Sequence, residues 1–122
     1  MKTIKYVLMG ALLFGAAAPG MAQDDNKAVI EQVVSVIKAK PANLNDQVKD
    51  FGKKYKKNTE VLLAIGRAFL EQKDLVNARD FAERALARDN KNAHVWLLKG
   101  DIAVSDNNGG DAAVAYQNAI YF

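Results

Sequence analysis

The sequence offers few side chains for nucleophilic or metal chemistry. It contains one histidine, His94, and no cysteine. A metal centre needs several convergent ligands, and a catalytic nucleophile needs a neighbouring base, so one histidine supplies neither. The serine-hydrolase, zinc-protease and phosphate-loop motifs are absent, and the pair Gly109–Gly110 is typical of a turn. We therefore expect no enzyme activity, no metal and no cofactor, and we expect His94 to be exposed in the first turn of a helix.

Basic residues form one dense run. Its members are Lys49, Lys53, Lys54, Lys56 and Lys57. We interpret this run as a solvated helix face, with an acidic partner or an anionic surface as the functional alternative. The formal net charge of the whole chain is +3, and Lys2 and Lys5 contribute two of the positive charges. This small charge gives no support to nucleic-acid binding.

Residues 1–22 have the pattern of a secretory signal peptide. Two lysines precede an uncharged, mostly apolar run, and Pro19 interrupts it. Gly20 and Ala22 are small residues that suit cleavage before Gln23. The alternative is an uncleaved anchor, although a membrane span needs about 20 apolar residues. Because the chain has no cysteine, it is not expected to be a lipoprotein. We expect export to the periplasm and no membrane span after cleavage.

Apolar residues recur every three or four positions along the rest of the chain, which predicts amphipathic helices. The predicted helices cover residues 28–39, 44–55, 59–72, 75–88, 94–105 and 111–122. No segment alternates with period two, so we expect no sheet. Loops of a few residues between helices imply antiparallel neighbours, and the predicted fold class is all-α.

Helix ends are predicted from their neighbouring residues. Pro41 should end the first helix, because the residue before a proline is pushed out of helical geometry. Asn43 or Asn45 should cap the second helix, and Asp74 should cap the fourth. The polar residues 23–27 are expected to be frayed. The run of asparagine and glycine over residues 106–110 is expected to be a turn.

Two stretches of the chain correspond at an offset of 34 residues. Leu62, Leu63, Gly66, Leu70, Ala78, Ala85 and Leu86 match Trp96, Leu97, Gly100, Val104, Ala112, Ala119 and Ile120. This period is that of stacked helix–turn–helix units, and it predicts an α-solenoid of antiparallel helix pairs. Gly66 and Ala78 are expected where two helices approach closely, and a larger side chain there would overpack. Trp96 and Tyr116 are expected to fill the core between units.

These residues resemble the tetratricopeptide repeat. The large, small and aromatic positions of the first helix hold Leu62, Gly66 and Phe69, and the alanines of the second helix are Ala78 and Ala85. The next unit matches with Trp96, Gly100, Ala112, Tyr116 and Ala119. It departs from the family pattern at Lys99 and Ala103, as the unit before it does at Ala82 and Asn90.

The repeats divide the chain after the leader into about three units. Residues 59–92 form one unit and residues 93–122 form another, incomplete at its C-terminus. Residues 23–58 match weakly, because Gln32 stands where a small residue belongs. We interpret them as a degenerate helix pair that acts as the N-terminal cap, since terminal repeats are often atypical.

The resemblance implies a protein–protein interaction scaffold of the bacterial envelope, which binds a peptide or partner protein on its concave helical face. Carried over by position, the partner-binding residues are Leu63, Arg67, Leu70, His94, Leu97, Asp101 and Val104. Arg67 and Asp101 occupy the same position in successive units, so their opposite charges are expected to pair. The lysine and asparagine set that clamps a peptide carboxylate in some members is absent. We therefore do not expect carboxylate capture.

The alternative is a structural fragment of a longer repeat array, with no binding activity of its own. The last unit stops four residues short of 34, and residues 119–122 are nearly all apolar. Repeat arrays need a terminal cap with a polar outer face to stay soluble. We therefore expect self-association through the C-terminal helix.

The leader is tested by its cleavage. Protein extracted from the envelope should have the intact mass of a chain that begins at Gln23, because Gly20 and Ala22 place the cut after Ala22. Mass spectrometry of the extracted protein measures this directly. Recovery of the full-length chain in the membrane fraction would favour the anchor instead.

Overall fold

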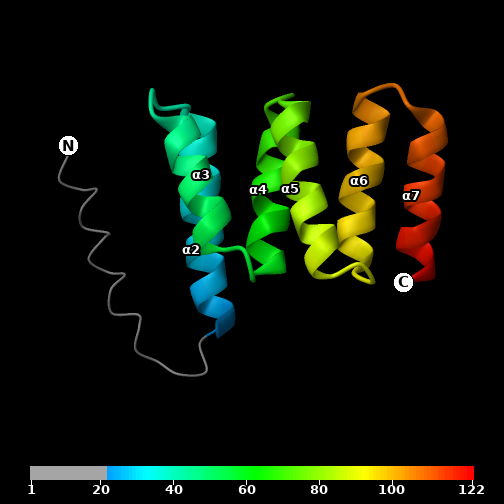
Figure 1. Cartoon of the computed structure of the whole chain (residues 1–122), viewed down its shortest axis with the longest axis horizontal. Coiled ribbons are helices and arrows are strands. Elements are labelled where there is room, and N and C mark those ends of the chain that lie inside the picture. The colour runs from blue at the N-terminus through cyan, green and yellow to red at the C-terminus, as the bar shows by residue number, and fades with distance from the viewer. Residues whose placement is uncertain (1–21) are drawn as a thin grey trace.

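A computed structural model describes residues 22–122, and the predicted leader up to residue 21 lies outside this range. Within the described range the chain forms helices and no strands, which confirms the predicted all-α class. The helices are α2 (Ala22–Ala39), α3 (Leu44–Lys54), α4 (Thr59–Glu71), α5 (Leu75–Arg88), α6 (Ala93–Ser105) and α7 (Gly109–Tyr121). They alternate in direction and form an α-solenoid of antiparallel helix pairs (Figure 1). None of the helices in residues 22–122 combines the length and apolar character needed to cross a membrane.

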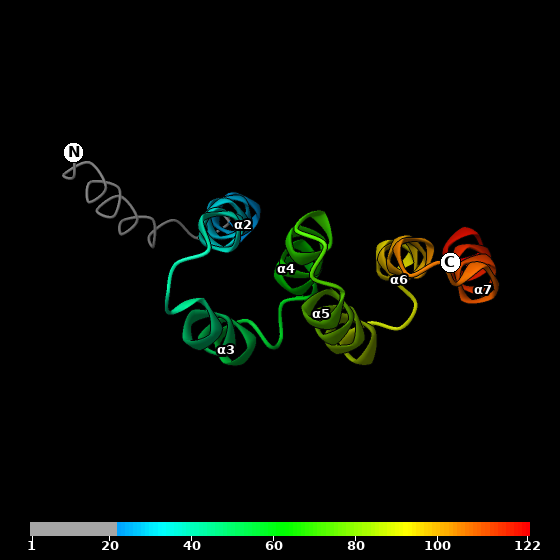
Figure 2. The ribbon, with the colours of Figure 1, turned by 90° about the horizontal axis from the view of Figure 1, so that it is seen from above.

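The helices lie in two rows. Figure 2 shows α2, α4 and α6 in one row and α3 and α5 in the other, whereas α7 lies beside α6 at the end of the first row. The largest fully buried side chains include Ile37, Leu62, Ile65, Phe69, Phe81 and Leu98. The rings of Phe69 in α4 and Phe81 in α5 stack with centroids 6.3 Å apart. The core is therefore centred on the α4–α5 pair.

The 34-residue period is present in the backbone as well as in the sequence. Side-chain caps begin α4, α5, α6 and α7 at Asn58, Asp74, Asn92 and Asn108. Each cap accepts a hydrogen bond from a backbone N–H of the first helical turn, which satisfies a group that lacks a partner within the helix. Lys73 and Asn107, directly before two of these caps, have φ angles of 64° and 56°. Matching residues of the two units thus build matching turns.

The helix α2 begins earlier than the sequence predicted. Residues 23–27 are helical, so the expected fraying is wrong. The side chain of Asn26 donates to Glu60 Oε1 at 2.7 Å and accepts from Asn58 Nδ2 at 2.8 Å. These bonds join α2 to the start of α4, and the sequence of residues 23–27 gives no sign of that distant partner.

The start of α7 and the cap of α3 also differ from the prediction. The helix α7 begins at Gly109 rather than Asp111, because Asn107 takes the left-handed conformation and Asn108 caps the helix. At α3 the capping position belongs to Asn43, but its side chain makes no capping bond and accepts from Gln47 Nε2 instead. The first helix ends at Ala39, as Pro41 predicted.

The first helix pair is more open than the others. The helix α2 packs more extensively against α4 than against α3, and Figure 2 shows α2 and α3 well separated. A hollow between them is lined by Gln32, Phe51, Tyr55 and neighbouring residues. Gln32, which stands at the position that corresponds to Gly66 and Gly100, is exposed and lines this hollow.

Gly66 lies where α4, α5 and α6 meet. A Cβ atom added to Gly66 would lie 2.9 Å from Leu98 Cδ2 and 3.5 Å from the carbonyl oxygen of Ala78. Ala78 is fully buried. The predicted close approach of Gly66 and Ala78 is therefore confirmed.

This contact is tested by enlarging Ala78. Ala78→Leu should lower the free energy of unfolding by about 1–3 kcal/mol, because the added carbons overpack the α4–α5 contact. For a domain of this size that corresponds to a fall in Tm of about 4–8 °C per kcal/mol, measurable by circular dichroism. Val76→Leu is the matched control, because Val76 lies in the same helix and is 75% exposed. Equal melting of the two variants would contradict the assigned contact.

Candidate partner-binding site

The predicted partner-binding residues lie on two neighbouring helices. Leu63, Arg67 and Leu70 belong to α4, and His94, Leu97, Asp101 and Val104 belong to α6. Spacings of three and four residues place the members of each set on one side of their helix. The two helices lie side by side in the first row (Figure 2). We call the surface that these residues form the α4–α6 face.

An ion pair connects the two helices on this face. Arg67 Nη1 lies 3.0 Å from Asp101 Oδ2, and both side chains are about one-third exposed. The pairing expected from their offset of 34 residues is thus present. Tyr116 of α7 donates its hydroxyl to the other oxygen of Asp101 at 2.6 Å. A single carboxylate therefore joins three helices.

This network changes the acidity of the tyrosine. The pKa of Tyr116 is raised, first because its hydroxyl donates to the Asp101 carboxylate, and then because of partial burial and the nearby negative charge. The positive charge of Arg67 partly offsets the rise. The hydroxyl consequently stays protonated and keeps its hydrogen bond over the whole physiological range.

The expectation that Tyr116 fills the core between units is wrong. Its ring packs against Gly100 of its own unit, and a Cβ atom at Gly100 would overlap that ring. The equivalent residue of the preceding unit is the fully buried Ala82. The ring position was missed because the family pattern gives the residue type but not the way its side chain turns.

The open apolar surface of the α4–α6 face comes from α6. Leu97 is 39% exposed and Val104 is 54% exposed. Leu63 and Leu70, at the same positions of the preceding unit, are half-buried and pack against the core. His94 is exposed in the first turn of α6, as predicted, and its backbone N–H is capped by Asn92. The apolar contacts available to a partner are thus those of Leu97 and Val104.

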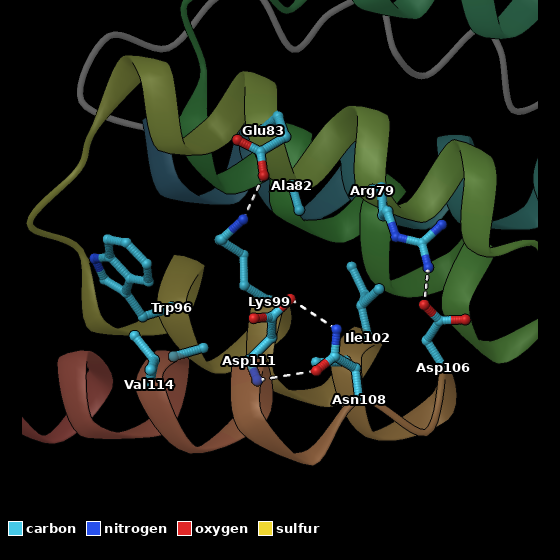
Figure 3. A pocket seen from close by; sticks show the side chains of 12 residues that line it. Arg79, Ala82, Glu83, Trp96, Lys99, Ile102, Asp106, Asn108, Asp111 and Val114 are labelled. Carbon is cyan, nitrogen blue, oxygen red and sulfur yellow. Dashed lines mark hydrogen bonds and ion pairs between the residues drawn. The ribbon is translucent and has the colours of Figure 1, made fainter.

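A groove of about 430 Å³ lies on the other side of α6. Successive residues of a helix are rotated by about 100°, so Lys99 and Ala103, each two residues from Asp101, point roughly opposite to it. The lining residues include Ala82, Trp96, Lys99, Ile102, Ala103, Val114 and Ala115 (Figure 3). Helix α5 and helix α7 form its walls, and α6 forms its floor.

Charged pairs border this groove. Arg79 Nη2 of α5 lies 2.6 Å from Asp106 Oδ2, at the end of α6. Lys99 of α6 pairs with Glu83 of α5 (Figure 3). Lys99, in place of the apolar residue of the family pattern, is the signal in the sequence for this open site.

Trp96 belongs to this groove rather than to the core. Its ring is half-buried, and its indole Nε1 donates to the backbone oxygen of Asn90 at 2.9 Å. The expectation that Trp96 fills the core between units is therefore wrong. The repeat position is occupied as predicted, but the neighbouring side chains that would enclose the ring are small.

No family model, no curated protein and no solved structure matches the chain. Within residues 22–122, no three histidine, aspartate or glutamate side chains lie close enough together to hold a metal ion.

The Tyr116–Asp101 bond is tested by its pH dependence. Tyr116→Phe should lower the free energy of unfolding at neutral pH by about 1 kcal/mol. The raised pKa in the folded state means that this contribution is complete below the unfolded pKa of about 10. It is lost as the pH rises through the folded value. Urea unfolding at increasing pH should therefore show the difference between the parent and the variant narrowing once the pH exceeds about 10.

Tyr121→Phe serves as the control, because Tyr121 is 81% exposed. Its difference from the parent should be small throughout that pH range. A constant gap between the parent and Tyr116→Phe at all pH values would contradict the bond to the carboxylate.

Proposed function

We propose that the chain is an exported, non-enzymatic interaction module of the bacterial envelope, built from tetratricopeptide-type repeats. Its α4–α6 face binds a peptide or a helix of a partner protein. The observation that carries the proposal is the pair of exposed apolar residues, Leu97 and Val104, on either side of a carboxylate held by two hydrogen bonds.

The spacing of the two apolar residues suits a peptide ligand. Leu97 and Val104 are seven residues apart, which is about 10 Å along a helix. A partner helix with apolar residues at positions i and i+7 has the same spacing, and so does an extended peptide with anchors three residues apart. Apolar anchors within a polar rim are the usual arrangement of protein interfaces.

The polar part of the face is preorganised. Both oxygens of Asp101 already have partners, so binding does not require this carboxylate to be ordered anew. Arg67 uses Nη1 for Asp101, and a guanidinium has five N–H donors. The remaining donors are suited to carbonyl oxygens of a bound peptide.

Export to the periplasm is part of the proposal and is supported by the charged start, the apolar run and the small residues before Gln23. The repeat assignment is supported by the matching caps and turns of residues 58–74 and 92–108.

Self-association is a second candidate, favoured by where apolar surface is exposed. The large apolar residues exposed among those described are Val76, Leu97, Val104, Val114, Ile120, Tyr121 and Phe122. All of them except Val76 belong to residues 93–122. Concentrated apolar surface marks an interface or an aggregation liability, so the last unit is a reasonable site for a second copy of the chain.

The α4–α6 face is tested by site-specific photocrosslinking in the cells that produce the protein. A photoreactive phenylalanine analogue at position 97 should give discrete crosslinked species, whereas the analogue at position 76 should not, because Val76 lies on α5 outside this face. Val104→Ser in the same chain should weaken those species several-fold by removing an apolar contact. If the crosslinks are equal at both positions, or unaffected by Val104→Ser, this face is not the binding site.

A further inference from the structure

The groove beside α6 occupies a place that is filled in the preceding unit. Ile65, Phe69 and Phe81 lie 34 residues before Lys99, Ala103 and Ala115. The first three are fully buried, and the two phenylalanine rings stack. Their counterparts line an open groove. Two aromatic rings that complete the core of one unit are thus absent from the next.

The vacant place keeps an apolar interior. Ala82, Ile102 and Ala115 are buried beneath it, and Trp96 of α6 also lines it (Figure 3). Aromatic side chains pack favourably against other aromatic rings in edge-to-face geometry. The charged groups that line the groove have partners of their own: Arg79 pairs with Asp106, Lys99 pairs with Glu83, and Asp111 accepts a hydrogen bond from Asn108 Nδ2 at 2.8 Å. An occupant with aromatic rings fits this chemistry.

The same unit exposes two aromatic side chains of this kind at its C-terminal end. Tyr121 is 81% exposed and Phe122 is 45% exposed. Their rings contact each other edge to face, with centroids 5.0 Å apart. This aromatic pair is separated by six residues from Ala115, which is about 9 Å along the rigid helix α7. Since α7 itself forms a wall of the groove, the chain cannot fold its own pair back into it.

We propose that the groove between α5 and α7 receives the Tyr121–Phe122 pair of a second copy of this chain. The pair replaces the two rings that Ala103 and Ala115 omit. It contacts Trp96 and the alanines of α5 and α7. Each copy carries both a groove and an aromatic pair, so copies associate through the last unit without the α4–α6 face.

The first experiment measures mass and fluorescence together. Purified protein is diluted from millimolar to low micromolar concentration and followed by sedimentation velocity and by the emission of Trp96, the single tryptophan of the chain. Association should shift the Trp96 emission to shorter wavelength over the same concentration range in which the mass increases, because the docked rings exclude water from the indole.

The aromatic pair is then removed. The double variant Tyr121→Ser, Phe122→Ser should lose both the mass increase and the emission shift, with association at least ten-fold weaker. Val76→Ser is the matched control, because it also removes an exposed apolar side chain and lies outside the groove. It should behave like the parent. Both sets of substitutions are at exposed positions, so neither is expected to prevent folding.

The groove is filled in a separate variant. Ala103→Phe restores the ring that Phe69 provides in the preceding unit, and it should also abolish association. A mixture of Ala103→Phe with the Tyr121→Ser, Phe122→Ser variant should associate more than either alone, because one variant retains the pair and the other retains the groove.

Three results would overturn the proposal. One is a parent that stays monomeric at millimolar concentration. Another is association without a change in Trp96 emission, which would locate the contact away from the groove. The third is a mixture that associates no more than its components. The Leu97 crosslinks lie on the opposite side of α6, so these results leave the proposed partner-binding face to its own test.

Discussion

Helices α4, α5 and α6 come together around Gly66, and the rest of the array depends on that close approach. Leu98 of α6 occupies the space that a Cβ atom of Gly66 would need, and the backbone of Ala78 lies beside it. With the helices held this close, Phe69 and Phe81 stack and are excluded from water. The first helix pair shows the opposite case. There Gln32 takes the position of the glycine, and a hollow separates α2 from α3.

In the last unit a glycine also permits a close contact between helices, but a different side chain fills the space. Gly100 again leaves room at the helix contact, but the ring of Tyr116 occupies it. The hydroxyl of this tyrosine bonds to Asp101, and Asp101 pairs with Arg67 of the preceding unit. These contacts hold α7 on the side of α6 that carries the α4–α6 face. Because Ala103 and Ala115 are too small to fill the other side, the groove opens there. The hydrogen-bond network of Asp101 and the groove therefore both follow from which residues occupy the repeat positions of the last unit.

Features set by neighbours in sequence were predictable, and features set by distant side chains were not. Local patterns predict the helices, the cap of α5 at Asp74 and the end of α2 before Pro41. The Arg67–Asp101 pair was predictable because the repeat offset itself states which residues are adjacent. The bonds of Asn26 to Asn58 and Glu60 were missed, since nothing in residues 23–27 indicates those partners. Trp96 was misplaced for a related reason. Its burial depends on Ala103 and Ala115, and a large residue is enclosed only if its neighbours are large enough to enclose it.

The two open sides of α6 differ in the side-chain contacts that connect them to neighbouring helices. On one side, Leu97 and Val104 project from α6, and the Asp101 carboxylate between them is hydrogen-bonded to Arg67 of α4 and Tyr116 of α7. On the other side, the ion pairs of Arg79 with Asp106 and of Lys99 with Glu83 join α5 to α6 and do not involve α7. Helix α7 is held by its packing on α6, where Ala112 and Ala115 are buried and the ring of Tyr116 covers Gly100. Tyr116 thus takes part both in the packing of α7 on α6 and in the hydrogen bonds of the α4–α6 face.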